Sequence, residues 1–177
     1  SRQNAQAILG DFNGDGKTDI LIVLQLPTAG ATLYLSTGTG FTAGISIPGS
    51  SDWWMYNIAA GDWNGDGKSD LILVSPNVGG FYGLGTSHKL YLSTGTGFAQ
   101  AKDSGGTAVT IPNTSSADNC GAYPTCVIPQ IADWNNDGAQ DILLVRNSGD
   151  AIYSFAYVPE LMTSVSDGIG NTTNVSY

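Results

Sequence analysis

The sequence predicts an all-β protein built of similar four-stranded antiparallel sheets, and three observations support this fold class. Residue types that favour strands and tight turns dominate the composition, with 24 Gly and only 12% charged residues. Short apolar segments alternate with clusters of turn residues, which is the pattern of strands rather than of long helices. Two motifs also recur in the same order along the 177 residues, so the sheets are copies of one unit.

The first recurring motif is a nine-residue acidic loop that contains nine of the fourteen aspartates. It reads DFNGDGKTD at 11–19, DWNGDGKSD at 62–70 and DWNNDGAQD at 133–141. Asp occupies positions 1, 5 and 9 in every copy, Asn position 3 and Gly position 6. Carboxylates this close together repel one another unless a cation lies among them. The repetition therefore predicts three metal sites.

The second motif, LYLSTGTGF, occurs at 33–41 and again at 90–98, in phase with the acidic loops. The loops begin 51 and 71 residues apart, and we attribute the longer interval to an insertion at about 101–123. Periods near 50 residues are typical of the blades of a β-propeller. We expect about three blades, hence a partial propeller. Its repeats would span 1–158, with blades at about 5–50, 51–112 and 126–158, and an exit segment toward a following domain at 159–177.

Each unit is predicted to contain four strands, with the acidic loop between the first two. The expected first strands are 6–10, 56–61 and 127–132; the second strands are 20–24, 71–74 and 142–145; the third strands are 32–36, 89–93 and 151–157; the fourth strands lie near 41–47 and 107–111. The second strands are continuously apolar, so they must be covered on both faces. Known propellers close with about four to eight blades. Three blades would leave two faces open, so we expect further blades upstream or self-association through the open faces.

The loop offers only oxygen ligands, which favours Ca²⁺ over Mg²⁺ or Zn²⁺. We assign side-chain ligands to positions 1, 3, 5 and 9 and a backbone carbonyl to position 7, where the side chain is left free. Position 2 is always aromatic (Phe12, Trp63, Trp134), which predicts a plug that anchors the loop to the core. The expected ligands of the three calcium ions are Asp11, Asn13, Asp15, Lys17 and Asp19; Asp62, Asn64, Asp66, Lys68 and Asp70; and Asp133, Asn135, Asp137, Ala139 and Asp141.

Two other interpretations of the loop fit less well. An EF-hand needs a bidentate Glu at position 12 and flanking helices. Here position 12 is Ile22, Leu73 or Leu144, inside predicted strands. A plain hairpin turn needs no Asp at positions 1, 5 and 9 in three copies.

Charge and composition argue against several function classes. Six Lys and Arg against a net charge of −9 exclude a nucleic-acid binder. No apolar run approaches the roughly 20 residues of a membrane helix. We expect no enzyme either: the single histidine, His88, is interpreted as a surface or turn residue, and Glu160 is the only Glu. The Ser-Thr-Gly-Thr-Gly segments lack the Lys and the helix of a phosphate-binding loop, so hairpin turns are expected there.

The two cysteines, Cys120 and Cys126, lie in a turn-rich segment and predict a small disulfide loop rather than free thiols. That loop and residues 78–86 are long, irregular and break the repeat, which makes them candidate partner surfaces. Six aromatic residues between the strands also allow an alternative, a carbohydrate-binding module, although blade packing uses aromatic residues too. These six are Trp53, Trp54, Tyr56, Phe81, Tyr82 and Tyr123.

The acidic loops resemble the FG-GAP/VCBS repeats found in integrin α-subunit heads and in many bacterial surface proteins. The resemblance covers about residues 5–158 and implies structural calcium sites in blades that contact other proteins or glycans. Residues 161–177 resemble the segment that follows such repeats in SpvB-type proteins, toxin-complex B components and Rhs-related toxins. The resemblance implies a secreted or cell-surface bacterial protein, with the chain as a scaffold of a toxin that binds other domains or subunits.

Overall fold

Antiparallel β-sheets make up the part of the chain that the computed structural model describes, namely residues 5–25, 28–75, 87–103, 105–112, 127–136, 140–146, 151–153, 164–166 and 172–174. The first sheet contains β1 (Ala5–Gly10), β2 (Asp19–Leu24), β3 (Gly30–Tyr34) and β4 (Ile45–Ile47) in that order. The second contains β5 (Asn57–Gly61), β6 (Asp70–Val74), β7 (Ser87–Ser93), β8 (Phe98–Gln100) and β9 (Thr110–Pro112). The third contains β10 (Val127–Ala132), β11 (Asp141–Arg146) and β12 (Ala151–Tyr153). The all-β expectation is confirmed for these residues.

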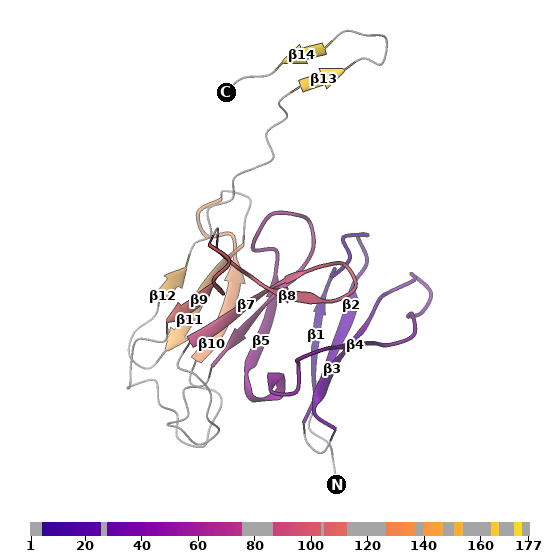
Figure 1. The fold of residues 1–177 in the computed structure, drawn as a ribbon, viewed down its shortest axis with the longest axis vertical. Helices are drawn as coiled ribbons and strands as arrows, with labels where there is room; N and C mark the ends of the chain where they lie inside the picture. Colours follow the sequence, from indigo (N-terminus) through magenta and orange to yellow (C-terminus); the bar gives the residue numbers. More distant parts are fainter. Residues whose placement is uncertain are drawn as a thin grey trace.

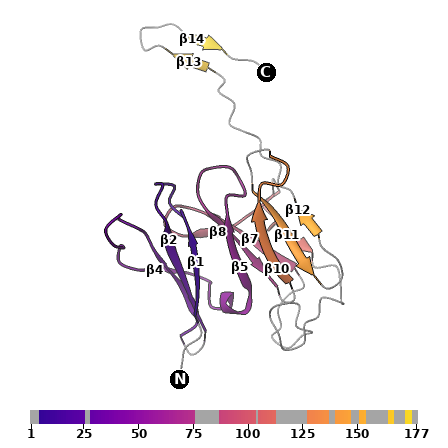
Figure 2. The ribbon, with the colours of Figure 1, turned by 180° about the vertical axis from the view of Figure 1, so that it is seen from behind.

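The three sheets lie side by side in chain order, as Figures 1 and 2 show from opposite sides. Their first strands are neighbours, because β1 contacts β5 and β5 contacts β10. A short 3-10 helix, η1 (Trp53–Met55), connects the first sheet to the second. This row of blade-like sheets is compatible with a sector of a propeller. Within the described residues, no helix is long and apolar enough to cross a lipid bilayer.

The acidic loop connects the first and second strands of every sheet, as the sequence predicts. Its ends are held by the same register in all three, with Gly10 opposite Asp19, Gly61 opposite Asp70 and Ala132 opposite Asp141. Residues that lie the same number of places after the loop therefore occupy equivalent positions in the three sheets. Residues one and three places after the final Asp face one side of the sheet, and residues two and four places after it face the other.

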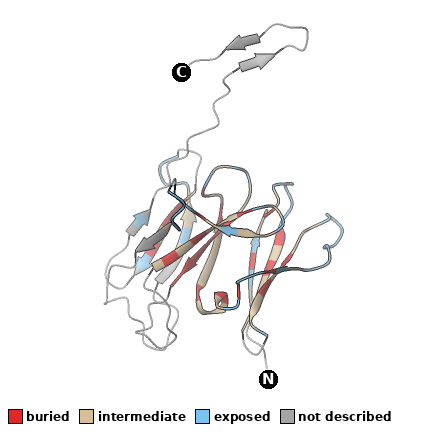
Figure 3. Cartoon of the chain, viewed as in Figure 1, coloured by how far each residue is buried: buried red, intermediate tan, exposed pale blue. Residues whose placement is uncertain are grey.

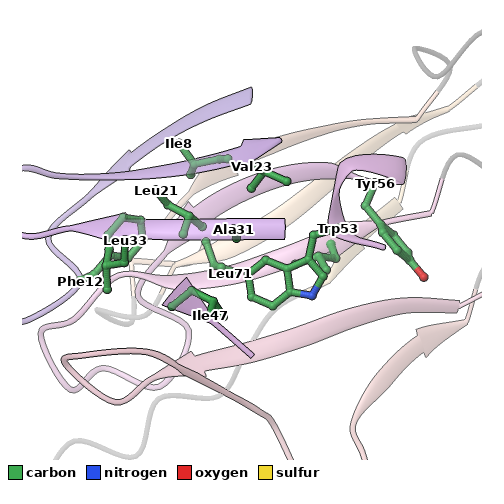
Figure 4. Close-up of a cluster of buried hydrophobic side chains, with 11 residues drawn as sticks. Ile8, Phe12, Leu21, Val23, Ala31, Leu33, Ile47, Trp53, Tyr56 and Leu71 are labelled. Atoms are coloured by element: carbon green, nitrogen blue, oxygen red, sulfur yellow. The ribbon is translucent and has the colours of Figure 1, made fainter. Parts of the chain in front are cut away.

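Two apolar cores fill the spaces between the sheets, coloured red in Figure 3. Figure 4 shows the first core, where Leu21 and Val23 of β2 meet Trp53 of η1 and Leu71 of β6. The opposite side of β6 contributes Ile72 and Val74 to the second core, together with Ile142 and Leu144 of β11. Every residue of β6 is buried, so the expectation of cover on both faces is confirmed there. Strands β2 and β11 are fully covered on one face only.

The fourth strand of the second sheet differs from the prediction, which placed one strand at 107–111. Two short strands pair with β7 instead: β8 with its end at Tyr91–Ser93 and β9 with its start at Ser87–Lys89. Residues 101–109 lie between the two strands. The backbone N–H of Val109 donates a hydrogen bond to the Ala101 carbonyl (2.8 Å). Both residues pack against the second core. The segment between Ala101 and Val109 therefore divides the predicted fourth strand into two short strands.

His88 is a core residue, so its interpretation as a surface or turn histidine is wrong. It lies fully buried in β7, and its Nδ1 accepts a hydrogen bond from the Ser75 backbone N–H (3.1 Å). The strand begins at Ser87, two residues earlier than predicted, and the pleat places His88 on the same face as the buried Leu90.

Two further strands, β13 (Ser164–Ser166) and β14 (Thr172–Asn174), form a separate antiparallel pair in the predicted exit segment. No strands were predicted in this segment. The expected end of the third repeat at 154–157 lies outside the described residues.

Replacing Gly10 by Ala is expected to destabilise the contact between the first two sheets. An added Cβ would lie 2.7 Å from the Ser69 Cβ and 3.1 Å from the Phe12 ring, and neither group can move away freely. Overpacking of this kind costs about 1–3 kcal/mol. Urea unfolding measures the effect. Gly97→Ala is the matched control, since its nearest neighbour would be the Thr94 hydroxyl at 3.6 Å, an ordinary contact. Equal stability of the two variants would contradict this packing.

Candidate metal loops and the contacts between them

The first acidic loop is wrapped around the carboxylate of Asp11, its first residue. Asp11 Oδ1 accepts hydrogen bonds from the backbone N–H groups of Gly14 (2.8 Å) and Asp15 (3.1 Å), and Oδ2 accepts one from Gly16 (2.7 Å). Gly14 and Gly16 have φ of 76° and 81°, a region that side chains with a Cβ rarely adopt. These glycines let the chain turn back toward its own first residue.

The second loop repeats this arrangement around Asp62. Its carboxylate accepts from the N–H groups of Gly65 (2.7 Å), Asp66 (3.2 Å) and Gly67 (2.9 Å), with Gly65 and Gly67 again at positive φ. Two loops 51 residues apart in sequence thus have the same internal geometry. A shared geometry explains why the residue types at positions 1, 4 and 6 recur.

The oxygens at positions 3 and 5 are also held by backbone amides. In the first loop, Asn13 Oδ1 accepts from the Asp15 N–H (3.1 Å), and Asp15 Oδ1 accepts from the Lys17 N–H (2.9 Å). In the second loop, Asn64 accepts from Asp66 (3.1 Å), which accepts from Lys68 (2.9 Å). Positions 1, 3 and 5 therefore present oxygen atoms whose placement the backbone controls.

The lysine at position 7 takes part in the loop through its side chain, contrary to expectation. Lys17 Nζ lies 2.9 Å from Asp15 Oδ2, and Lys68 Nζ lies 2.7 Å from Asp66 Oδ2. The hydrogen bond from Lys17 lowers the pKa of Asp15 below its ordinary value. The sequence analysis missed this pair because it assigned only a carbonyl to position 7. Each lysine neutralises one of several carboxylates in its loop.

The aspartate at position 9 is fully buried and connects three segments of its own sheet. Asp19 Oδ2 accepts from the Phe12 N–H (2.9 Å) and Oδ1 from the Ser36 N–H (2.7 Å). Asp70 repeats both contacts, with Trp63 (3.2 Å) and Ser93 (2.7 Å). The acidic loop and the Ser-Thr-Gly-Thr-Gly motif are therefore parts of one hydrogen-bonded unit, which explains why they recur in phase.

Burial makes Asp70 a weaker acid than an exposed aspartate. Desolvation is the main cause and raises its pKa to about 7, and the negative charges of Asp66 and Asp62 act in the same direction. The N–H groups of Ser93 and Trp63 oppose this shift by favouring the ionised form. Negative charge in this loop is thus costly in the absence of a neutralising cation.

The third loop is described at residues 133–136 and 140–141, whereas Asp137 and Ala139 lie outside the described residues. Asn136, at position 4, has φ of 59° and confirms that this position needs a residue tolerant of positive φ. Asp141 is fully buried and accepts from the Trp134 N–H (3.0 Å), as its counterparts do. The carboxylate at position 9 therefore accepts the same hydrogen bond from the residue at position 2 in all three loops.

The aromatic plug at position 2 is confirmed in two loops and wrong in the third. Phe12 is buried in the first core and Trp63 in the second, whereas the Trp134 side chain is 52% exposed. Phe12 and Trp63 are each covered by the next sheet along the chain. Among the described residues, no further blade-like sheet follows the third one to cover Trp134 in the same way.

Position 8 joins each loop to the preceding one, a role that the sequence analysis did not foresee. Ser69 Oγ accepts from the Asp11 N–H (3.0 Å), and the Ser69 N–H donates to the Asp11 carbonyl (2.7 Å). Gln140 makes the same two contacts with Asp62, at 2.8 and 3.2 Å. The only signal in the sequence is that position 8 is always polar, as Thr18, Ser69 or Gln140.

A second contact between sheets comes from the Ser-Thr-Gly-Thr-Gly motif. Ser93 Oγ donates a buried hydrogen bond to the Phe12 carbonyl (2.6 Å), while its N–H donates to Asp70. The next residues form the predicted tight turn, closed by Thr94 N–H to the Gly97 carbonyl (2.9 Å), and Thr37 to Gly40 closes its counterpart (2.9 Å). The first and second loops are thus linked by side chains of both repeated motifs.

The donor chemistry of the loops fits a calcium ion. Carboxylate, amide and backbone carbonyl oxygens are its preferred ligands, and backbone amides hold those at positions 1, 3 and 5. Over the described part of the chain, however, no group of three or more His, Cys, Asp or Glu side chains is placed to hold a metal ion together. Ion binding would therefore bring the carboxylates closer together and compete with the lysine at position 7.

The aromatic residues proposed for sugar stacking are used in packing where they are described. Trp53 and Tyr56 are buried in the first core, and Trp53 contacts the ring of Tyr91 at a centroid distance of 5.0 Å. The packing interpretation is confirmed for these two. Phe81, Tyr82, Tyr123 and the predicted disulfide of Cys120 and Cys126 lie outside the described residues, as do residues 78–86.

Comparison with protein-family models gives one match: residues 11–73 match the FG-GAP-like repeat. The matched segment runs from the first position of the first acidic loop to the third residue after the second loop. It therefore includes two acidic loops and the Asp11–Ser69 contact between them. A search of curated proteins gave no match.

In chelator, Asp70→Ala is expected to destabilise the protein much more than Asp66→Ala. Removing Asp70 leaves the buried N–H groups of Ser93 and Trp63 without acceptors, at about 1–3 kcal/mol for each group. Asp66 pairs with Lys68 at the surface, where such pairs contribute at most about 1 kcal/mol. Urea unfolding of both variants in chelator measures the difference. Similar losses would contradict the structural role assigned to position 9.

Proposed function

We propose that this chain is a calcium-stabilised β-propeller segment that serves as a non-enzymatic protein-interaction scaffold. The observation that carries the proposal is the shared set of backbone hydrogen bonds around Asp11 and Asp62 in two loops of oxygen donors. A hairpin turn alone does not need an acidic residue at positions 1, 5 and 9. A calcium loop needs oxygen donors at such alternating positions.

The chain's own residues would hold three ions, one in each loop. The side chains at positions 1, 3, 5 and 9 and the carbonyl at position 7 are the proposed ligands. A bound ion would supply positive charge that neutralises the loop carboxylates and so favours the folded state over the unfolded one. The third loop would have the lowest affinity, since Asn136 takes the positive-φ position that Gly14 and Gly65 hold in the other loops.

The effect of the ions would extend from the loops to the interfaces between sheets. Asp11 is both the first proposed ligand and the backbone partner of Ser69 in the next loop. Asp62 has the same two roles toward Gln140. An ion that fixes position 1 therefore also fixes the backbone that the neighbouring sheet binds. Calcium would make the row of sheets rigid enough to present surfaces to other proteins.

We further propose that the parent protein is a secreted or cell-surface bacterial protein, and specifically a toxin component. The resemblance of residues 161–177 to the segment after such repeats in bacterial toxins supports this assignment. Calcium is abundant outside cells, where loops of micromolar to millimolar affinity are filled. Within the toxin, this segment would bind other domains or subunits, and the toxic activity would belong to another domain.

Calcium is expected to raise the melting temperature of the chelator-treated protein. At a free concentration about one hundred times Kd, each filled site adds about 2.7 kcal/mol. For a chain of this length, that corresponds to about 5–10 °C per site. Calorimetry in chelator and in millimolar Ca²⁺ measures the shift. An unchanged melting temperature would contradict the proposal.

Two isosteric variants make this test specific to the loops. Asp66→Asn removes one charge from the second loop and is expected to reduce the calcium-dependent shift. Asp103→Asn makes the same chemical change in an exposed turn outside the loops, where Asp103 accepts hydrogen bonds from Gly105 and Thr107 (both 2.9 Å). It is expected to keep the full shift. A general effect of calcium on protein charge would reduce both shifts equally.

Lys68→Ala is expected to increase the affinity of the second loop for calcium. The Lys68 ammonium competes with the ion for Asp66 and adds positive charge to the site. Isothermal titration calorimetry measures the change, and Lys102→Ala is the control for an exposed lysine outside the loops. A loss of affinity as large as that caused by Asp66→Ala would show that the lysine side chain assists binding.

A further inference from the structure

In the described part of the chain, the large exposed apolar side chains lie on the outer faces of the row of sheets. Among the described residues, five large apolar side chains are exposed: Leu9 (60%), Phe41 (50%), Trp134 (52%), Val145 (38%) and Ile152 (55%). The first two belong to the first sheet and the other three to the third sheet or its loop. None belongs to the second sheet, which has a neighbour on each side.

The outer side of the first sheet, here called the leading face, has the residue pattern of an interface between sheets. It consists of Leu9, Thr18, Ile20, Ile22, Ser36 and Phe41. Leu9 pairs with Ile20, and both point away from Leu21 and Val23, which lie in the first core. Leu71 and Leu73 hold the positions of Ile20 and Ile22 in the second sheet, and both are buried against the first sheet.

The outer side of the third sheet, here called the trailing face, has the complementary pattern. It consists of Trp134, Leu143, Val145 and Ile152, with Leu143 opposite Ile152 in the register. Leu143 and Val145 hold the positions of Leu21 and Val23 in the first sheet, which are buried against the second sheet. Trp134 holds the position of Phe12, which is buried in the same core.

An aromatic contact at the first interface shows how the two faces fit each other. Phe12 meets Phe98 edge to face, with ring centroids 5.3 Å apart. Phe12 corresponds to Trp134 on the trailing face, and Phe98 corresponds to Phe41 on the leading face. Both of these outer aromatic residues are about half exposed. Each outer face therefore presents one of the two aromatic residues that contact each other at the interface between the first and second sheets.

The hydrogen-bonding residues of the leading face follow the same correspondence. Thr18 holds the position of Ser69, and Ser36 holds the position of Ser93, whose hydroxyl donates to a carbonyl of the preceding loop. Thr18 is exposed. The leading face thus has hydroxyl groups at both positions that join one loop to the preceding loop inside the protein.

We propose that two copies of this chain associate head to tail, with the leading face of each on the trailing face of the other. One chain carries both halves of the interface, and the contact continues the packing already present between its own sheets. A heterologous contact of this kind either closes into a ring or grows into a filament. The described residues of each copy contribute three blade-like sheets, so two copies give six, within the range of about four to eight in which propellers close.

This inference names a partner for the proposed scaffold and rests on its interaction role, but not on calcium. Sedimentation velocity of the chain over a range of micromolar concentrations, in chelator and in millimolar Ca²⁺, is expected to show a species of twice the 18.3 kDa chain mass. A dimer in both conditions would support the head-to-tail contact, whether or not calcium raises the melting temperature. A monomer at every concentration in both conditions would overturn the head-to-tail dimer alone.

Complementation between variants tests the geometry of the contact. Phe41→Asp changes only the leading face and Ile152→Asp only the trailing face, and each is expected to weaken dimerisation at least tenfold. A mixture of the two retains one intact contact, between the trailing face of the first variant and the leading face of the second. It is expected to form a mixed dimer, detectable with a fluorescent label on one variant.

Ala99→Asp is the control, because Ala99 is exposed on β8 of the second sheet, away from both outer faces. It is expected to dimerise like the unmodified chain, and circular dichroism verifies that all variants are folded. Should the mixture stay monomeric, or should Phe41→Asp alone dimerise normally, the head-to-tail arrangement would be refuted. If a face variant fails to fold, Phe41→Ser or Ile152→Ser replaces it in the same assay.

Discussion

The structure depends on one buried carboxylate per repeat, the aspartate at position 9 of the acidic loop. In the first two sheets, this carboxylate accepts hydrogen bonds from the loop it closes and from the Ser-Thr-Gly-Thr-Gly turn of the same sheet. It therefore adds side-chain hydrogen bonds to the backbone pairing of three neighbouring segments. Burying a charged group is unfavourable unless it is paired and hydrogen-bonded. In these two sheets the motifs recur in phase because the N–H of Ser36 or Ser93 donates to the carboxylate of Asp19 or Asp70.

The loops also set the relation between neighbouring sheets. Ser69 and Gln140 bind the backbone at position 1 of the preceding loop, and the alternating residues of β6 enter both apolar cores. Polar contacts fix the register of the sheets, while apolar area stabilises their association. The same side chains repeat at equal spacing, so one rule describes both interfaces. The corresponding positions on the outer faces of the first and third sheets are also apolar, which is why those faces expose apolar residues.

Much of the fold follows from sequence pattern alone. The apolar run after each loop predicts a second strand, and the register from Asp19, Asp70 and Asp141 confirms its start to within one residue. The position of the loop between the first two strands follows from the same pattern. The spacing of apolar residues and the residue types of the turns carry this information, because both depend on residues that are close in the chain.

Contacts between distant segments were harder to predict. The burial of His88 depends on where β7 begins, and a shift of two residues in a strand start carries no strong signal. The exposure of Trp134 depends on which sheets follow in space, although its residue type matches Phe12 and Trp63. The role of Ser69 requires knowing that the preceding loop lies beside it. Each of these features is set by tertiary packing, which local propensity does not determine.

The most direct test of the account is a crystal structure of the chain grown in millimolar calcium, with anomalous data to identify the ion. The account predicts an ion in each acidic loop, with oxygen ligands from positions 1, 3, 5, 7 and 9 at about 2.3–2.6 Å. It would be contradicted by loops that keep the lysine of position 7 on Asp15 and Asp66 and contain no ion at that calcium concentration.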